Sequence, residues 1–95
     1  MKARRVERRS QIKIIADILD AIVKVGDARV TYILTAANLS YDRLQRYLNL
    51  LLRQGLILER VENDVKIYSI TKKGLDFLRE FKRIEEFAKA FGIPV

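Results

Sequence analysis

The fold of this chain is decided by Asn38-Leu39-Ser40-Tyr41-Asp42-Arg43-Leu44-Gln45-Arg46-Tyr47-Leu48-Asn49-Leu50-Leu51-Leu52-Arg53-Gln54-Gly55. The stretch predicts a helix that begins after Ser40, whose hydroxyl can accept a hydrogen bond from a first-turn N–H, and that ends at Gly55. At about 100° per residue, its apolar side gathers Leu44, Tyr47, Leu48, Leu51 and Leu52. The opposite side carries Asp42, Arg46, Asn49 and Arg53, with Arg43 at its edge. This pattern indicates a helix that packs on a core and presents a basic face to an acidic partner.

A shorter helix is predicted just before it, from Asp27 or Ala28 through Ala36, although its β-branched residues lower the helix propensity. The connection is a small turn in which Asn38 tolerates a left-handed conformation and Leu39 would fill the angle between the two helices. Two helices joined by so short a turn, the second with a basic outer face, form a helix-turn-helix.

The first helix is predicted over residues 10–25, with Gly26 as its stop. Its apolar stripe consists of Ile12, Ile15, Ala16, Leu19, Ile22 and Val23. Ile14 and Ile18 lie off that stripe, so the helix is apolar over more than one side. We therefore expect two neighbouring elements to cover it.

Residues 56–70 change to a period of two on either side of a polar turn at residues 62–64, which predicts a β-hairpin. A hairpin directly after a helix-turn-helix is the wing of a winged-helix domain. The tip of this wing is acidic, and residues 55–71 carry a net charge of −1. Because Glu62 and Asp64 would repel a phosphate, wing contacts are restricted to Arg60 and Lys66.

A last helix is predicted from Thr71 to the Gly92-Ile93-Pro94 stop. Its apolar seam follows the 4, 3, 4, 3 spacing of a coiled coil and consists of Phe77, Phe81, Ile84, Ala88 and Phe91, with Phe87 beside it. So small a chain has little core left to cover this seam, so we expect it to pair with the same helix of a second copy. The alternatives are a helix folded back over the first helix and a helix lying on a membrane surface, the latter disfavoured by Glu80, Glu85 and Glu86.

Composition limits the class of protein. The chain has 95 residues, 49% of them hydrophobic and 33% charged, which is typical of one folded, soluble domain. The net charge of +7 favours polyanionic partners, nucleic acid first and an anionic membrane surface second. Cysteine and histidine are absent, which excludes disulfides, the usual zinc sites and Cys/His nucleophiles. No cofactor or small-molecule ligand is indicated.

The N-terminus is charged where a signal peptide would be apolar, and no stretch approaches about 18 uninterrupted apolar residues. We therefore expect a cytoplasmic protein that does not enter a membrane. Residues 1–13 hold most of the net charge, +5, from Lys2, Arg4, Arg5, Arg8, Arg9 and Lys13 against Glu7. Residues 1–9 are interpreted as a basic arm, or a basic extension of the first helix, that contacts nucleic-acid phosphates. The alternative is a solvated terminus that aids solubility.

Four segments also carry a resemblance: Ala37-Asn38-Leu39-Ser40-Tyr41, Tyr47, Gly55-Leu56-Ile57 and Tyr68-Ser69-Ile70-Thr71-Lys72-Lys73-Gly74. With them, nearly the whole chain resembles the archaeal winged-helix DNA-binding proteins of the Sulfolobales "ten-a" chromatin-protein type. The resemblance implies a mainly helical winged helix-turn-helix, an antiparallel coiled-coil dimer formed by the last helix, and binding to double-stranded DNA. Only 24 residues follow Thr71, so the coiled coil would be shorter than the family's usual one. The acidic wing tip is a second departure.

The main hypothesis is a homodimeric DNA-binding protein, either a transcription regulator or a chromatin protein, whose helix over residues 40–54 enters the major groove. We expect base or phosphate contacts near the start of that helix from Ser40, Tyr41, Arg43, Arg46 and Asn49. Arginine can form two hydrogen bonds with guanine and asparagine with adenine, whereas Arg53 is expected at a phosphate. Tyr41 leans toward the leucine side, so a core position is equally compatible with its spacing.

The expected organisation is a basic arm over residues 1–9, a winged helix-turn-helix over 10–70 and a dimerisation helix over 71–92. A protein–protein interaction module of a transcription assembly is the alternative function. An enzyme is disfavoured because the carboxylates of the hairpin have no convergent partner. The sequence leaves open whether the dimer spans successive grooves of one duplex or bridges two duplexes.

Overall fold

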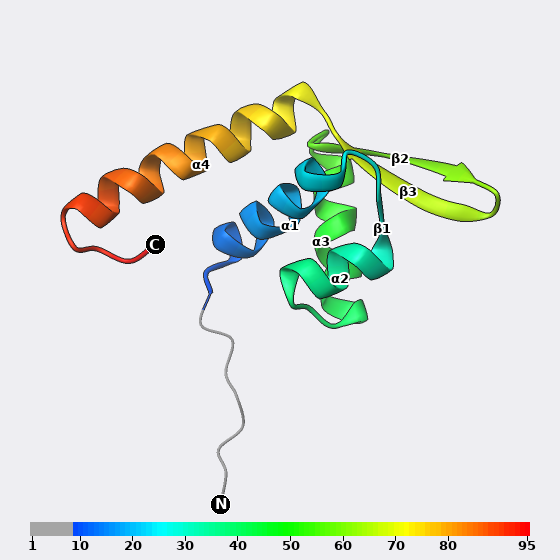
Figure 1. Ribbon diagram of the computed structural model, residues 1–95, viewed down its shortest axis with the longest axis horizontal. Coiled ribbons are helices and arrows are strands. Elements are labelled where there is room, and N and C mark those ends of the chain that lie inside the picture. Colours follow the sequence, from blue (N-terminus) through cyan, green and yellow to red (C-terminus); the bar gives the residue numbers. More distant parts are fainter. Residues whose placement is uncertain (1–8) are drawn as a thin grey trace, which may run out of the picture.

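The structure is a computed structural model that describes residues 9–95 (Figure 1). Its elements follow in the order α1 Gln11–Val25, β1 Ala28–Arg29, α2 Val30–Ala37, α3 Tyr41–Arg53, β2 Ile57–Glu62, β3 Val65–Ile70 and α4 Lys72–Ala90. Four helices and a small antiparallel sheet confirm the predicted mainly helical fold, in which a hairpin follows a helix-turn-helix. In the described part of the chain, no helix is both long and apolar enough to cross a bilayer.

The strand β1 corrects the prediction that the second helix begins at Asp27 or Ala28. Ala28 and Arg29 are extended and pair with Tyr68 and Ile67 of β3, so the sheet has the order β1-β3-β2. One edge of β3 is hydrogen-bonded to β2. The backbone groups of Ala28 and Arg29 find their hydrogen-bond partners along its other edge. A strand of two residues is too short to show any alternation, and the sequence pattern therefore missed it.

The wing is the hairpin of β2 and β3, paired from Ile57 with Ile70 to Glu62 with Val65. Its two-residue turn has positive φ at both Asn63 (51°) and Asp64 (64°). Such turns match the right-handed twist of the strands, and asparagine and aspartate tolerate this conformation. The predicted hairpin is confirmed, and in Figure 1 it projects away from the helices.

The core is centred on α1, which contacts α2, α4 and the sheet. Ile14, Ile18, Leu19 and Ile22 of α1 are at most 1% exposed. They meet Leu44, Leu48 and Leu51 of α3 in one cluster that also includes Ile33, Tyr68 and Leu78. We expected two neighbouring elements to cover α1, and the structure shows more than two: α2, α4 and the sheet.

The stripe assigned to α1 is wrong in part, since Ile12 and Val23 are exposed while Ile14 and Ile18 are fully buried. Because this helix is apolar on several sides, helical spacing alone did not distinguish the buried residues from the exposed ones.

The turn between α2 and α3 has the predicted conformation. Asn38 is left-handed, with φ of 56°, and Leu39 packs against the core cluster. Ser40 caps α3, its hydroxyl oxygen accepting a hydrogen bond from the N–H of Arg43 at 3.3 Å. Gly55 follows α3 with φ of 74°, as expected for a residue that ends a helix. These features fix the direction in which α3 leaves the turn.

The start of α4 is fastened to the domain. The Thr71 hydroxyl donates to the carbonyl of Gly55 at 2.7 Å and accepts from the N–H of Gly74 at 3.0 Å. Gly74 lies so close to the backbone of Leu56 that a Cβ atom there would overlap the Leu56 carbonyl oxygen. The first turn of α4 therefore has a fixed position relative to the wing.

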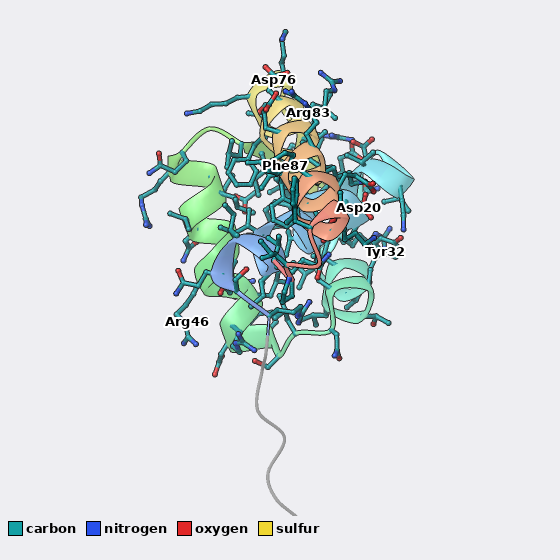
Figure 2. The ribbon with its side chains drawn as sticks, turned by 90° about the vertical axis from the view of Figure 1, so that its left-hand side faces the viewer. Asp20, Tyr32, Arg46, Asp76, Arg83 and Phe87 are labelled. Carbon is teal, nitrogen blue, oxygen red and sulfur yellow. The ribbon has the colours of Figure 1, made fainter. Side chains whose placement is uncertain are left out.

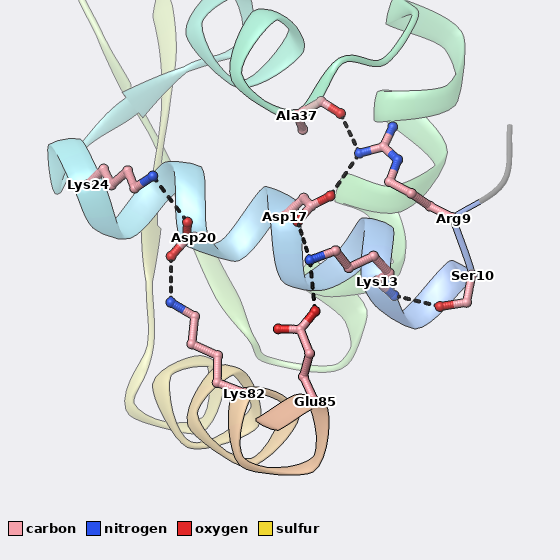
Figure 3. A network of polar contacts seen from close by, with 9 residues as sticks. All are labelled: Arg9, Ser10, Lys13, Asp17, Asp20, Lys24, Ala37, Lys82 and Glu85. Carbon is pink, nitrogen blue, oxygen red and sulfur yellow. Dashed lines mark hydrogen bonds and ion pairs between the residues drawn. The ribbon is translucent and has the colours of Figure 1, made fainter. Parts of the chain in front are cut away.

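The first half of α4 packs on its own domain, as the fold-back alternative described. Leu78 and Phe81 are each 5% exposed in the core, and Phe77 packs against the same cluster. Phe81 was predicted in the dimer seam, but the monomer already covers it. Lys82 also pairs with Asp20 of α1 at 3.0 Å, and Lys13 of α1 with Glu85 at 3.1 Å (Figure 3).

The second half of α4 carries a stripe that the monomer leaves uncovered, which we call the α4 stripe: Ile84, Phe87, Ala88 and Phe91. Ile84 is 58% exposed, and Phe87 and Phe91 are each 67% exposed. The Phe87 and Phe91 rings contact one another, with centroids 5.1 Å apart. Phe87 is among the side chains at the exposed end of α4 in Figure 2.

Candidate nucleic-acid interface

The outer face of α3 is built as the sequence predicted. Leu44, Leu48 and Leu51 are buried, so the opposite side of the helix faces solvent with Arg46, Asn49 and Arg53 exposed. Arg46 points away from the body of the protein (Figure 2). Tyr41 is 58% exposed, which decides against its alternative as a core aromatic.

The cations of this face are not compensated by nearby acids. Within residues 9–95, Arg46 and Arg53 form no hydrogen bond or ion pair. By contrast, eight cations lie within 3.5 Å of a carboxylate: Arg9, Lys13, Lys24, Arg60, Lys72, Arg79, Lys82 and Arg83. Residues 9–95 carry a net charge of +4, of which α3 contributes +2, with Asp42 as its only acidic residue.

Two residues at the start of α3 have structural contacts of their own. The hydroxyl oxygen of Ser40 is used as the helix cap, which leaves its O–H free to donate to another group. Arg43 is half-buried at the flank of the helix, toward the start of α1, and its side chain lines a groove together with Gln11. Both residues lie where the sequence placed them.

One of the two cations predicted to contact DNA from the wing is paired with carboxylates. The guanidinium of Arg60 donates to both oxygens of Asp27, at 3.3 and 3.1 Å, and to Glu62 at 2.8 Å. This pairing lowers the pKa of the Asp27 carboxyl and raises the pKa of Arg60 from their ordinary values. A phosphate at Arg60 would compete with these two carboxylates, and the DNA contact of Arg60 stays a prediction.

Lys66, the other wing cation, is exposed and its Nζ lies 4.0 Å from Glu59. Glu59 also accepts a hydrogen bond of 2.6 Å from the hydroxyl of Tyr68. Burial, together with this bond, raises the pKa of the Tyr68 phenol above its ordinary value. Glu59 is thus shared by two donors, and Lys66 is the more available of the two predicted wing contacts.

Arg9 has a role that the sequence did not reveal. Its guanidinium donates to Asp17 at 2.9 Å and to the carbonyl of Ala37 at 2.7 Å (Figure 3). It also donates to the carbonyl of Asn38 at 3.1 Å. Arg9 therefore ties the start of α1 to the turn before α3 and corrects its assignment to a free arm. Arg4, Arg5 and Arg8, the remaining arginines predicted in the arm, lie outside the described residues.

No charge count could have found this contact, because Arg9 is 28 residues from Ala37. The sequence also missed Gln11, which looks like the first residue of a core helix and yet lines the groove beside α3. In the described part of the chain, no group of three or more carboxylates is arranged to hold a metal ion.

Comparison with known proteins identifies the family. The winged helix-turn-helix profile matches residues 8–89, which is most of the chain. The chain belongs to the winged helix-turn-helix family. In the terms of this family, α3 is the recognition helix and the hairpin of β2 and β3 is the wing. No match was found among curated protein sequences.

Solved structures with the same winged helix-turn-helix include Sso10a-2, a DNA-binding protein from Sulfolobus solfataricus. It has 31% sequence identity and a TM-score of 0.75, and the match covers 88% of this chain and 90% of that one. A protein from Archaeoglobus fulgidus has 18% identity and a TM-score of 0.68, over 80% of this chain and 84% of its own.

MepR, a transcription regulator of a Staphylococcus aureus multidrug efflux pump, has 18% identity and a TM-score of 0.71, over 82% of this chain and 61% of its own. At these low identities, the last two similarities establish the fold alone.

Proposed function

We propose that this protein binds double-stranded DNA as a homodimer, with α3 in the major groove. The observation that carries the proposal is the outer face of α3, on which Arg46 and Arg53 are exposed and without a partner in the described chain. An unpaired arginine can meet a phosphate or a guanine edge without first giving up a carboxylate. The protein acts by binding rather than by catalysis, in the compartment that holds the DNA.

The residues of α3 divide by position. Tyr41, Arg43 and Arg46 lie along the half of the helix that follows the turn, where recognition helices contact base edges, and Asn49 lies just beyond its middle. B-DNA's major groove is about 12 Å wide and admits one α-helix. Arg53, at the end of α3, is assigned to a phosphate. Ser40 can donate its free O–H to a neighbouring phosphate while it caps the helix.

Further phosphate contacts are assigned to Lys66 on the wing and to the arm residues Arg4, Arg5 and Arg8. Arg60 is left out of the assignment, since three of its five N–H donors already bond to Asp27 and Glu62. The acidic tip at Asp64 opposes a deep approach of the wing to the DNA backbone. Affinity then depends on α3 and the N-terminal region more than on the wing.

The dimer is assigned to the α4 stripe, with α4 of a second copy packed antiparallel against it as a short coiled coil. The stripe is apolar, lies at helical spacing and is left open by the first copy. Phe77, whose ring packs on the domain, lies at the edge of this interface, and Phe81 is left out of it because its own domain covers it. The domain limits of 1–9, 10–70 and 71–92 then correspond to arm, DNA-binding domain and dimerisation helix, with Arg9 moved from the first to the second.

Sso10a-2 supports the finer assignment to the "ten-a" type, because its identity of 31% extends over 90% of its own length and it is a DNA-binding protein. The assignment includes a regulatory or an architectural role on DNA. Which of these applies depends on the spacing of the two recognition helices in the dimer.

The test is a titration of isotopically labelled protein with a DNA duplex, followed residue by residue by NMR. We expect the largest shifts at the amides of residues 40–53 and small shifts at the wing tip, residues 62–64. A duplex that shifts the wing tip and the exposed face of α4 but leaves residues 40–53 unchanged would contradict the proposal.

A further inference from the structure

A groove of about 430 Å³ runs along the flank of α3 that faces the start of α1. It is lined by Gln11, Arg43, Arg46, Tyr47, Leu50 and Arg53. Three of these six side chains are arginines and none is a carboxylate. The groove is on the opposite flank of α3 from Tyr41, which lies close enough to Tyr68 of the sheet to influence its pKa.

The α1 side of the groove has a fixed position. Arg9 holds the start of α1 by its bonds to Asp17 and to the carbonyl of Ala37 (Figure 3), and by a further bond to the carbonyl of Asn38. Ser10 caps the helix by accepting the N–H of Lys13 at 3.1 Å. Gln11, the first residue of α1, is therefore held beside the arginines of α3.

We propose that this groove binds a phosphate of the DNA backbone and that Gln11 is a further DNA contact. The proposal rests on the proposed function and makes it more specific. A concave site lined by guanidinium groups suits a phosphodiester, because the planar guanidinium forms two parallel bonds with phosphate oxygens. The Gln11 amide adds a donor from a second helix.

The position of the groove explains how the protein would bind the DNA backbone although its wing offers few phosphate contacts. On the wing side, Arg60 is engaged by Asp27 and Glu62, and the tip carries Asp64. On the α1 side, Arg46 and Arg53 have no partner in the described chain and share the groove with Gln11. The backbone contacts are therefore displaced to the α1 side of the recognition helix.

The experiment changes the charge of the groove at a surface position. Gln11→Lys and Gln11→Glu are compared with the wild-type protein by fluorescence anisotropy on one labelled duplex over a series of salt concentrations. Gln11 is exposed, so both variants should keep the fold, which circular dichroism checks. Glu86→Gln is the matched control for Gln11→Lys, since it also raises the net charge by one, by removing a carboxylate, but lies on α4.

We expect Gln11→Lys to raise affinity at low salt by roughly fivefold and to make the log–log salt slope more negative by about 0.9, the value for one added phosphate contact. Gln11→Glu should lower affinity by a similar factor, and Glu86→Gln should change it little. If both Gln11 variants behave like the control while the wild-type protein binds DNA, the groove assignment is wrong and the proposed function stands. If the wild-type protein does not bind the duplex, the proposed function fails first.

A small phosphate compound in solution could occupy the groove in place of a DNA phosphate, because it presents the same oxygens to the arginines. Inorganic tripolyphosphate, titrated alone, should perturb the Gln11 amide only weakly and should compete with the duplex. The opposite result would be saturable shifts of the Gln11 amide with tripolyphosphate and no shift of this amide with the duplex. That result would assign the groove to a small anion and overturn the proposal.

Discussion

Replacing Arg43 and Arg46 together by alanine is expected to weaken duplex binding by about 100-fold, because each lost arginine contact to a base or phosphate removes roughly 1–3 kcal/mol of binding free energy. The thermal transition should move little, since Arg46 is exposed and Arg43 lies at the flank of α3, outside the core. Anisotropy with a labelled duplex measures the first quantity and circular dichroism the second.

The matched control is the pair Arg79→Ala and Arg83→Ala, which removes two arginines from the exposed side of α4. Arg79 forms an exposed ion pair with Asp76, and Arg83 forms one with Glu80. The loss of these exposed ion pairs costs little stability. The control should bind the duplex nearly as well as the wild-type protein. Equal affinity of the two double variants would mean that the outer face of α3 is not the DNA contact.

The second large effect is expected from Ile84→Glu. Ile84 is 58% exposed in the monomer and lies at the beginning of the α4 stripe, so a charge there leaves the monomer intact. In an antiparallel coiled coil the same charge would be buried between two apolar helices, which is strongly unfavourable. We expect a shift from dimer to monomer in sedimentation equilibrium. The affinity for DNA should also fall, because the two linked DNA-binding sites of the dimer become one.

Lys89→Glu is the control for the dimer, since it also introduces a carboxylate into the exposed second half of α4 but lies off the stripe. This variant should remain dimeric. A wild-type protein that is already monomeric at high concentration would contradict the assignment of the α4 stripe to self-association.

The recognition helix could be predicted because its signals are local. Ser40 caps α3, Gly55 ends it and three buried leucines recur at helical spacing between them, all within one short segment. The wing could be predicted equally well, because the alternation of residues on both sides of the Asn63-Asp64 turn is recognised without knowledge of the rest of the chain. The exposed basic face of α3 followed from the same periodicity.

Other features depend on contacts between distant segments. A helical spacing shows that Phe81 and Ile84 share a seam, but it does not distinguish Phe81, covered by its own domain, from Ile84, which remains exposed. Counting charges made Arg9 and Arg60 candidate DNA contacts, but it could not show which groups of the protein they bond. Their partners, Ala37 for Arg9 and Asp27 for Arg60, lie 28 and 33 residues away and become visible only in three dimensions.

The central claim, that this winged helix-turn-helix binds DNA through uncompensated positive charge, is tested most directly by titrating random and genomic duplexes of equal length across a salt series. Neutralising roughly six phosphates predicts a slope near −5 when the logarithm of the binding constant is plotted against the logarithm of salt concentration. The difference between the two duplexes measures sequence preference in the same experiment. Weak binding that does not change with salt would contradict the claim and favour a protein-interaction module instead.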